Sequence, residues 1–324
     1  MHHETDMTRS RGRILERFVA AIDGAAEMLA SRSERRPGQP PEQVPSLPSL
    51  LHQCRKMSEE ASAARPDPIR TIHHFACTGG TLISKCLASM PNTQVLSEVD
   101  PLSAQAHVSP TKFFPTDFIR LLREGSRPVD DALLVKVFVT GLDAAYTSAR
   151  SAGLHIIVRD HAHSHFCTGN APAKRPSLRQ IIADSFATRS VITVRHPLDS
   201  YLSLKALGWI NFRPGTLDDY CHRYHCFLNC YQTVPLFRYE DFISNPATVM
   251  QQICEELEIS FVESFRDLFS VHSLSGDSGR KESVISFRPR RSVPQDVEAE
   301  IHSSSEYQSL CERLDFDPEG LGYG

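Results

Sequence analysis

The sequence lacks several features that would assign it to other classes of protein. Its 324 residues contain nine cysteines but no CxxC pair, and no apolar run approaches the roughly 20 residues that span a bilayer. The N-terminus carries polar and charged residues where a secretory signal peptide needs an apolar core. We therefore expect a cytoplasmic protein with reduced, structural thiols and no integral membrane segment.

An excess of basic residues is also missing. The chain has 35 Lys and Arg against 39 Asp and Glu, which gives a formal net charge of −4. Such a chain has no overall positive field to attract nucleic acid or an anionic membrane surface. We expect no nucleic-acid partner, and any anion site must be local. The hydrophobic share of 40% is enough for a buried core.

The first part of the chain has a helical pattern followed by a break. Apolar residues recur at helical spacing through residues 11–31, and a charged stretch and a proline-rich stretch follow. These features predict an N-terminal helical extension with a proline-rich linker over residues 1–68. The main domain is then expected over residues 69–324.

Beyond residue 69, short apolar runs alternate with amphipathic stretches. The alternation predicts an α/β fold, a parallel β-sheet flanked by helices, in which ligands bind beyond the carboxyl ends of the strands. The expected strands cover residues 71–76, 132–139, 154–159 and 190–195. The expected helices cover residues 80–89, 114–124, 176–185, 198–208, 216–230 and 246–257.

A glycine-threonine turn follows the first expected strand, in the segment FACTGGTLISK at residues 75–85. Gly79 and Gly80 allow a tight turn, and Thr78 and Thr81 place hydroxyls beside the start of the next helix. Backbone N–H groups and the helix dipole favour a phosphate at such a place. A plain turn with a threonine cap fits the same residues. The GxxxxGK[ST] order is absent, which disfavours an ATP or GTP phosphate loop of the usual kind.

A second candidate anion site follows the expected strand at residues 190–195. In the segment RHPLDSYLS, Arg195 ends the strand and Ser203 lies eight residues later, inside a helix. A guanidinium and a hydroxyl in this arrangement can bind a phosphate. Alternatively, Arg195 pairs with Asp199 and only ties the strand to the helix.

Three segments, TGGT, RHPLDSYLS and FRYEDFISNP at residues 237–246, occur in this order. In this respect residues 70–315 resemble the sulfotransferases that use 3′-phosphoadenosine-5′-phosphosulfate (PAPS). The resemblance implies a P-loop-like fold and transfer of a sulfuryl group from PAPS, a cosubstrate, to a hydroxyl or amine, with no metal required. The acceptor, whether a small molecule, a carbohydrate or a lipid, and the oligomeric state stay open.

The resemblance also implies roles for individual residues. Tyr239 matches a position that contacts the adenine, and Arg280 lies in a segment, residues 275–282, that resembles a loop closing over the 3′-phosphate. Arg280 is equally consistent with a solvated loop charge. The positions that match the 5′-phosphosulfate loop are Thr78, Gly79, Gly80 and Thr81, and those that match the 3′-phosphate site are Arg195 and Ser203.

The sequence departs from the family pattern at one position. Many family members carry a lysine just before the loop hydroxyls, whereas this chain has Cys77. Lys85, one turn into the following helix, points its stem back toward the helix N-terminus and could supply the charge. Lys85 could instead pair structurally with an acid such as Glu98.

Candidate acid–base residues follow the expected strand at residues 154–159, in the segment RDHAHSH. A histidine at a strand carboxyl end is a suitable general base near neutral pH. By resemblance, His161 matches the histidine of a Lys-Thr-His segment, and Arg159 replaces the lysine that stabilises the sulfuryl group. Glu98 is the second candidate for the base. The competing interpretation is a metal cluster formed by His161, His163 and His165.

Two other functions fit parts of the pattern. A nucleotide-dependent kinase shares phosphate loops and parallel sheets with sulfotransferases. A non-catalytic nucleotide-binding protein would keep the fold without turnover, and Cys77 in place of the lysine keeps that possibility open.

Overall fold

The structure, a computed structural model, describes residues 49, 52, 66–103, 117–127, 129–275 and 284–319. The chain divides into two compact units, Met1–Pro66 and Asp67–Gly324. The helix expected at residues 11–31 lies outside the described residues, so the helical character of the N-terminal extension stays a prediction. The description below concerns the second unit.

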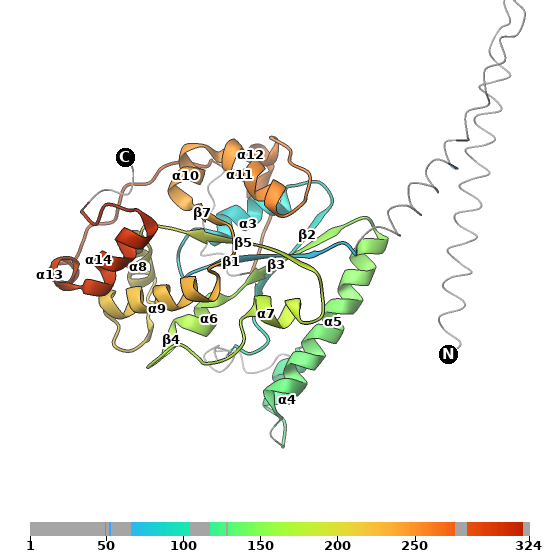
Figure 1. Ribbon diagram of the computed structural model, residues 1–324, viewed down its shortest axis with the longest axis horizontal. Helices are drawn as coiled ribbons and strands as arrows, with labels where there is room; N and C mark the ends of the chain where they lie inside the picture. The colour runs from blue at the N-terminus through green and yellow to red at the C-terminus, as the bar shows by residue number, and fades with distance from the viewer. Residues whose placement is uncertain are drawn as a thin grey trace, which may run out of the picture. The chain divides into compact units, whose positions relative to one another are not determined.

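A five-stranded parallel sheet forms the centre of this unit, with strand order β2-β3-β1-β5-β7 (Figure 1). The sheet confirms the expected α/β fold. Strand β1 is buried along its whole length, as expected for a parallel strand covered on both faces. The strands are β1 (Ile69–His74), β2 (Thr93–Val99), β3 (His155–Asp160), β5 (Thr188–Val194) and β7 (Leu236–Arg238).

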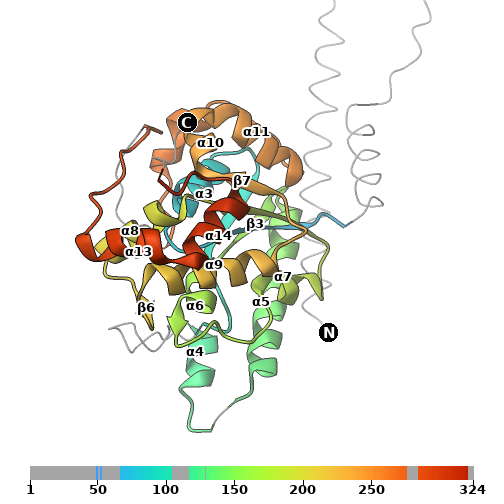
Figure 2. The ribbon, with the colours of Figure 1, turned by 60° about the vertical axis from the view of Figure 1, so that its left-hand side comes forward.

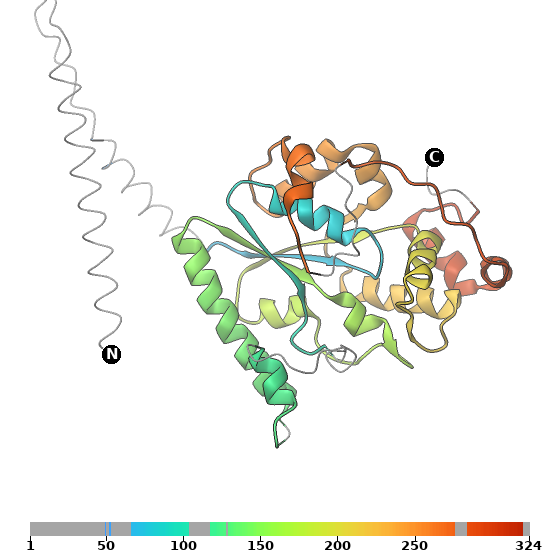
Figure 3. The same ribbon diagram turned by 180° about the vertical axis from the view of Figure 1, so that it is seen from behind.

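Helices cover both faces of the sheet (Figures 1 and 3). One face is packed by α3 (Gly80–Ala88), α10 (Tyr239–Ser244), α11 (Pro246–Glu256), α12 (Phe265–Leu268) and the short helix η2 (Phe269–Val271). The other is packed by α5 (Asp131–Ser151), α6 (Ala162–Phe166), α7 (Leu178–Ala183) and α9 (Leu217–Cys230). Beside α9 lie α8 (Pro197–Ala206), α13 (Gln295–Ser303) and α14 (Ser305–Leu314), as Figure 2 shows.

Three of the four expected strands are confirmed, as β1, β3 and β5. The helices expected at five places are confirmed as α3, α7, α8, α9 and α11. The sixth, expected at residues 114–124, begins outside the described residues, and α4 (Phe118–Arg123) lies within its range.

The strand expected at residues 132–139 is wrong, because this segment belongs to helix α5. The backbone N–H of Leu133 donates to the carboxylate of Asp130, which caps the helix. Leu134, Phe138 and Leu142 then recur at helical spacing and pack against the core. The apolar run at residues 132–139 is compatible with a strand or a helix. The helical spacing of apolar residues continues through residue 151, which favours the helix. Among the helices that the structure describes, α5 is long and apolar enough to cross a membrane, judged by length and composition alone.

The topology places the ends of β1 and β5 at a crevice. The chain leaves β1 toward β2 at one edge of the sheet, and it leaves β5 toward β7 at the other edge. Neighbouring strands whose connections run in opposite directions open a crevice at their carboxyl ends, where ligands of such sheets bind. The segments after β1, β3 and β5 all reach this crevice.

Candidate functional site

The glycine-threonine turn joins β1 to α3 at the crevice. Gly79 has a φ of 85°, and a Cβ there would lie 2.3 Å from the ring of Tyr239. A Cβ on Gly80 would lie 2.2 Å from the ring of His74. Both positions therefore require glycine. Within the described residues, no side chain caps the first turn of α3, which carries the positive end of the helix dipole and lines the pocket.

The hydroxyls of the turn have different tasks. The Thr78 hydroxyl donates to the carbonyl oxygen of Phe75 at 2.8 Å and closes the turn. The Thr81 hydroxyl accepts a hydrogen bond of 2.9 Å from Arg159. Cys77, between β1 and these hydroxyls, has a φ of 62°, a strained conformation for a residue other than glycine. The turn thus holds a defined, partly strained shape at the carboxyl end of β1.

Arg195 follows β5 and reaches the same turn. Its guanidinium carbon lies 5.0 Å from the centroid of the Tyr239 ring, and its Nη1 lies 3.5 Å from the carbonyl oxygen of Cys77. Its Nε is buried and has no hydrogen-bond partner among the described residues. A buried guanidinium N–H without a partner is costly, which marks this group as a candidate ligand for an anion.

The alternative pairing of Arg195 with Asp199 is wrong. Asp199 accepts two hydrogen bonds from Arg290 instead, at 2.9 and 3.3 Å, and both side chains are buried. The hydroxyl of Ser203 donates to the backbone oxygen of Asp199 at 2.8 Å, one helical turn earlier. The first turns of α8 therefore bind the segment around Arg290.

That segment contributes two further arginines that the sequence analysis did not assign. Arg288 and Arg291 flank the anchored Arg290 and line the same pocket. Three arginines within four residues were a readable signal of an anion site. Arg280, which was expected to contribute here, lies outside the described residues.

The two candidates for the general base, Glu98 and His161, contact each other. Glu98 occupies a bulge in β2 between Leu96 and Val99 and has a φ of 61°. Its Oε2 lies 3.2 Å from Nε2 of His161, and its Oε1 lies 2.7 Å from Nη2 of Arg159. Bulges and positive φ values recur at functional sites because they redirect a side chain. Here they direct the carboxylate of Glu98 between a histidine and an arginine.

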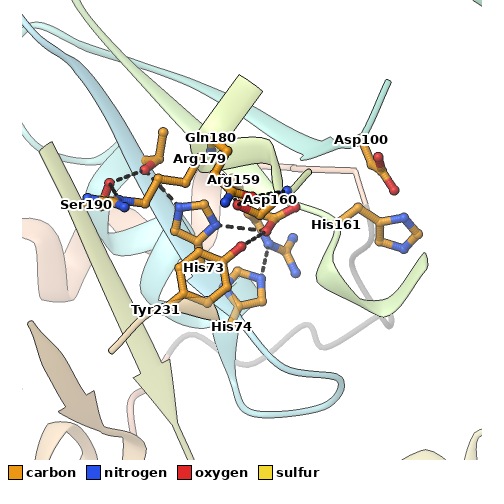
Figure 4. A network of polar contacts seen from close by, with 12 residues as sticks. His73, His74, Asp100, Arg159, Asp160, His161, Arg179, Gln180, Ser190 and Tyr231 are labelled. Atoms are coloured by element: carbon orange, nitrogen blue, oxygen red, sulfur yellow. Dashed lines mark hydrogen bonds and ion pairs between the residues drawn. The ribbon is translucent and has the colours of Figure 1, made fainter. Parts of the chain in front are cut away.

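Arg159 is the most highly connected side chain of the site. Its guanidinium makes four hydrogen bonds and one ion pair. Nε donates to Nε2 of His74 at 2.7 Å, as Figure 4 shows. The other acceptors are Ser97 Oγ at 3.0 Å, the Ser275 carbonyl oxygen at 3.1 Å, Thr81 Oγ1 at 2.9 Å and Glu98 Oε1 at 2.7 Å.

A buried polar network fixes the end of β3 against its neighbours (Figure 4). The carboxylate of Asp160 accepts hydrogen bonds from Tyr231 at 2.9 Å and from Nδ1 of His73 at 2.8 Å. Nε2 of His73 lies 2.9 Å from Thr71 Oγ1, which lies 2.7 Å from Ser190 Oγ. Burial raises the pKa of Asp160, but the hydrogen bond and charge of His73 outweigh it and hold that pKa below its usual value. Because Asp160 lies between Arg159 and His161 in the chain, the network fixes the backbone that carries both residues.

The three histidines after β3 point to different partners. His161 contacts Glu98, the ring of His163 lies near the backbone of Trp209, and Nε2 of His165 lies 3.0 Å from the Ala173 carbonyl oxygen. Across the described ranges, no group of three or more His, Cys, Asp or Glu side chains is placed to hold a metal ion. The metal interpretation of these histidines therefore has no support in this part of the chain.

One pocket of about 480 Å³ brings nearly all of these residues together. Lys85, which is buried on α3, is among them. The predicted site residues that line it are Thr78, Gly79, Gly80, Thr81, Lys85, Glu98, Arg159, His161, Arg195, Ser203 and Tyr239. The pocket is also lined by Leu207, Trp209, Asn211, Arg288 and Arg291.

Comparisons with known proteins bear on the fold of the chain. No family model and no curated protein matches the chain. Among solved structures, the sulfotransferase domain of the Synechococcus PCC 7002 olefin synthase is similar to it with 18% identity and a TM-score of 0.51, covering 78% of this chain and 96% of that domain. A sulfotransferase from Alicyclobacillus acidocaldarius has 16% identity, a TM-score of 0.42 and coverage of 78% and 97%. The chain has the fold of the sulfotransferases.

Proposed function

We propose that this protein is an enzyme that transfers a sulfuryl group from PAPS to a hydroxyl or amine of an acceptor. The observation that carries the proposal is Arg195. Its buried, unpartnered Nε lies in the same pocket as the glycine-threonine turn, and its guanidinium lies over the ring of Tyr239. A donor with anionic groups on both the 3′ and the 5′ position of its ribose fits one pocket that has two separate places for an anion, the start of α3 and Arg195.

The residues divide between the two ends of the donor. The amides of α3, with the turn at residues 78–81, hold the 5′-phosphosulfate. Arg195 and Ser203 hold the 3′-phosphate, and Arg288 and Arg291 add charge at that end because Arg290 anchors them on α8. Tyr239 contacts the adenine. To bind a phosphate, the Ser203 hydroxyl turns away from the Asp199 carbonyl oxygen to which it donates.

The acceptor loses its proton to His161. If Nε2 of His161 donates to Glu98, then Nδ1 carries the free lone pair and can accept the proton. Both oxygens of Glu98 already accept from neighbours, so Glu98 orients the ring and stabilises the imidazolium that forms. Glu98 and His161 thus act as a pair in which His161 is the base.

The chemical step is a substitution at sulfur. The acceptor oxygen or nitrogen forms a bond to the sulfur atom while the bond from sulfur to the bridging phosphate oxygen breaks. The electron pair of that bond leaves with adenosine 3′,5′-bisphosphate (PAP), and the acceptor proton moves to His161. Lys85 and the amides of α3 stabilise the charge that develops on the departing oxygen. Arg159, which contacts both residues, holds Thr81 and Glu98 in position.

Donor specificity tests the proposal. PAP should raise the melting temperature of the full-length chain, because it binds the folded state only, whereas ATP at the same concentration should not. Transfer of radiolabel from ³⁵S-labelled PAPS to an alcohol or amine should follow. The reverse nucleotide preference would instead support a kinase, and PAP binding without any transfer would support a non-catalytic nucleotide-binding protein.

The acid–base pair has its own test. His161→Ala should lower kcat by about 10²–10⁴-fold at saturating PAPS, the range typical of a general base. Glu98→Gln, which keeps the shape of the side chain, should lower kcat less. If His161→Ala turns over normally while Glu98→Gln is inactive, Glu98 is the base. PAP binding to each variant shows whether the pocket is intact.

A further inference from the structure

One wall of the pocket has no task in donor binding. Two segments build it, the start of α6 and the segment after α8. The short parallel pairing of β4 (Thr168–Gly169) with β6 (Asn211–Phe212) ties these segments together. The ring of His163 also lies near the backbone of Trp209, which brings the two halves of the wall together. The wall is therefore a built surface whose two halves are fixed to each other.

His163 presents an unsatisfied acceptor on this wall. Its Nε2 is buried and has no partner among the described residues. In the tautomer that carries its proton on Nδ1, the side from which the Trp209 backbone can be reached, Nε2 has a lone pair. Burial, together with the charge of His161, lowers the pKa of His163 to about 4, so the ring is neutral at physiological pH. A neutral ring with a bare Nε2 needs a hydroxyl or N–H donor from a ligand.

The rest of this wall is uncharged and shallow. Its other pocket-lining residues are Ala162, Leu207, Trp209 and Asn211, with no Asp, Glu, Lys or Arg among them. Leu207 and Trp209 are each 39% exposed, so they form an open shelf and not an enclosed apolar slot. An exposed indole beside amide and imidazole groups suits a ring that has an apolar face and hydroxyls at its edge.

We propose that this wall binds the acceptor and that the acceptor is an uncharged sugar ring. The inference rests on the proposed sulfuryl transfer. One hydroxyl of the sugar faces His161 and is sulfated, and a neighbouring hydroxyl donates to Nε2 of His163. The ring centroids of the two histidines are 6.1 Å apart, which allows hydroxyls on adjacent carbons to reach both. The apolar face of the sugar lies on Trp209.

Trp209 is the single tryptophan of the chain, so its fluorescence reports binding directly. The full-length protein, saturated with PAP, is titrated with methyl β-glucoside, methyl β-galactoside, methyl β-N-acetylglucosaminide and methyl β-glucuronide. At least one neutral glycoside should shift the emission, and the uronide should bind at least about tenfold more weakly because its carboxylate has no cation on this wall.

Two variants locate the contact. In His163→Asn the amide can still reach the Trp209 backbone, but the acceptor at Nε2 is lost, so glycoside affinity should fall about tenfold. His165→Asn, on the same helix but outside the pocket, is the matched control and should leave affinity unchanged. PAP affinity should be unaltered in both variants.

Three outcomes would overturn the inference: no neutral glycoside shifts the emission, the uronide binds as tightly, or His163→Asn binds as the parent does. Failure of the proposed function is distinguishable from these. If PAP does not bind, the donor assignment fails, and titration of the nucleotide-free protein still tests the sugar shelf. If sulfuryl transfer to a simple alcohol such as cyclohexanol occurs without glycoside binding, only the acceptor inference fails.

Discussion

Two buried arginines, Arg159 and Arg195, lie at the carboxyl ends of the two strands on either side of β1, yet their surroundings differ. Arg159, in β3, makes four hydrogen bonds and one ion pair with groups of the protein. Arg195, just after β5, has one contact of 3.5 Å to a carbonyl oxygen and an Nε without a partner in the described residues. The first guanidinium is satisfied by the fold, whereas the second needs a ligand.

The difference separates positioning from binding within a single pocket. Arg159 joins the turn, β2 and the backbone of Ser275, so its removal should disturb the shape of the site. Arg195 makes few contacts within the fold, so its removal should mainly cost ligand affinity. A sequence motif with an arginine at a strand end does not distinguish these roles, because the acceptors around each guanidinium come from distant segments.

The largest expected effect tests the positioning role. Arg159→Met should lower the free energy of unfolding by about 3–5 kcal/mol, because it leaves Glu98 and the buried Nε2 of His74 without their donor. Unfolding in guanidinium chloride measures the change. Arg159→Lys keeps the charge but not the five donors, and it should recover only part of the loss. An Arg159→Met protein of normal stability that has lost PAP binding would make Arg159 a ligand-binding residue.

The next effect tests the binding role. Arg195→Ala should weaken PAP binding by about 10²–10³-fold, because it removes charge-assisted hydrogen bonds worth about 1.5–3 kcal/mol each. Isothermal titration calorimetry measures the affinity. Arg189→Ala, an exposed arginine at the start of the same strand, is the control and should bind PAP normally. Loss of stability as large as that in Arg159→Met would remove the contrast between the two residues.

The smallest effect concerns Glu240, a buried carboxyl beside Arg195. Its Oε1 accepts from the backbone N–H of His196 at 3.0 Å, and its Oε2 is buried without a partner in the part of the chain that the structure describes. Burial raises the pKa of Glu240 to about 7. The folded protein then holds a proton that the unfolded chain releases near its ordinary pKa of 4.5, so this group lowers stability as pH rises from about 4.5 to 7.

Glu240→Gln should therefore be more stable than the parent at pH 8, by up to about 3 kcal/mol, and equal to it near pH 4.5. Thermal or denaturant unfolding at several pH values measures the difference. An unchanged difference between the two proteins from pH 5 to pH 8 would show that Glu240 does not take up this proton. The result bears on Arg195, because an ionised Glu240 supplies a negative charge near that guanidinium.

Local signals predicted the parts of the site that depend on backbone conformation. Gly79 has a positive φ, and the ring of His74, six residues earlier, occupies the space where a Cβ on Gly80 would be. Short apolar strands followed by helices gave β1, β3 and β5 and thus the position of the crevice. Such features are encoded within about ten residues of the sequence, so periodicity and turn chemistry reveal them.

The parts that were missed depend on contacts between distant segments. The run at residues 132–139 suits a strand locally, and its packing on the core as α5 decides otherwise. Edge strand β2 is only partly buried and gave a weak pattern. The pairing of Glu98 with His161 depends on a bulge that turns the carboxylate toward β3. Arg288 and Arg291 reach the pocket because Asp199, much earlier in the chain, binds Arg290 in the same segment.

The contact between Arg290 and Asp199 also sets when the site can be completed during synthesis. These residues are 91 positions apart in the chain. The strands that form the crevice leave the ribosome early, but the arginines of the last segment can reach α8 only after most of the chain has emerged. A chain released before residue 288 would contain the whole sheet and the turn, yet would lack the arginines of the last segment that line the pocket. Binding of the proposed donor would therefore indicate that synthesis has passed residue 291.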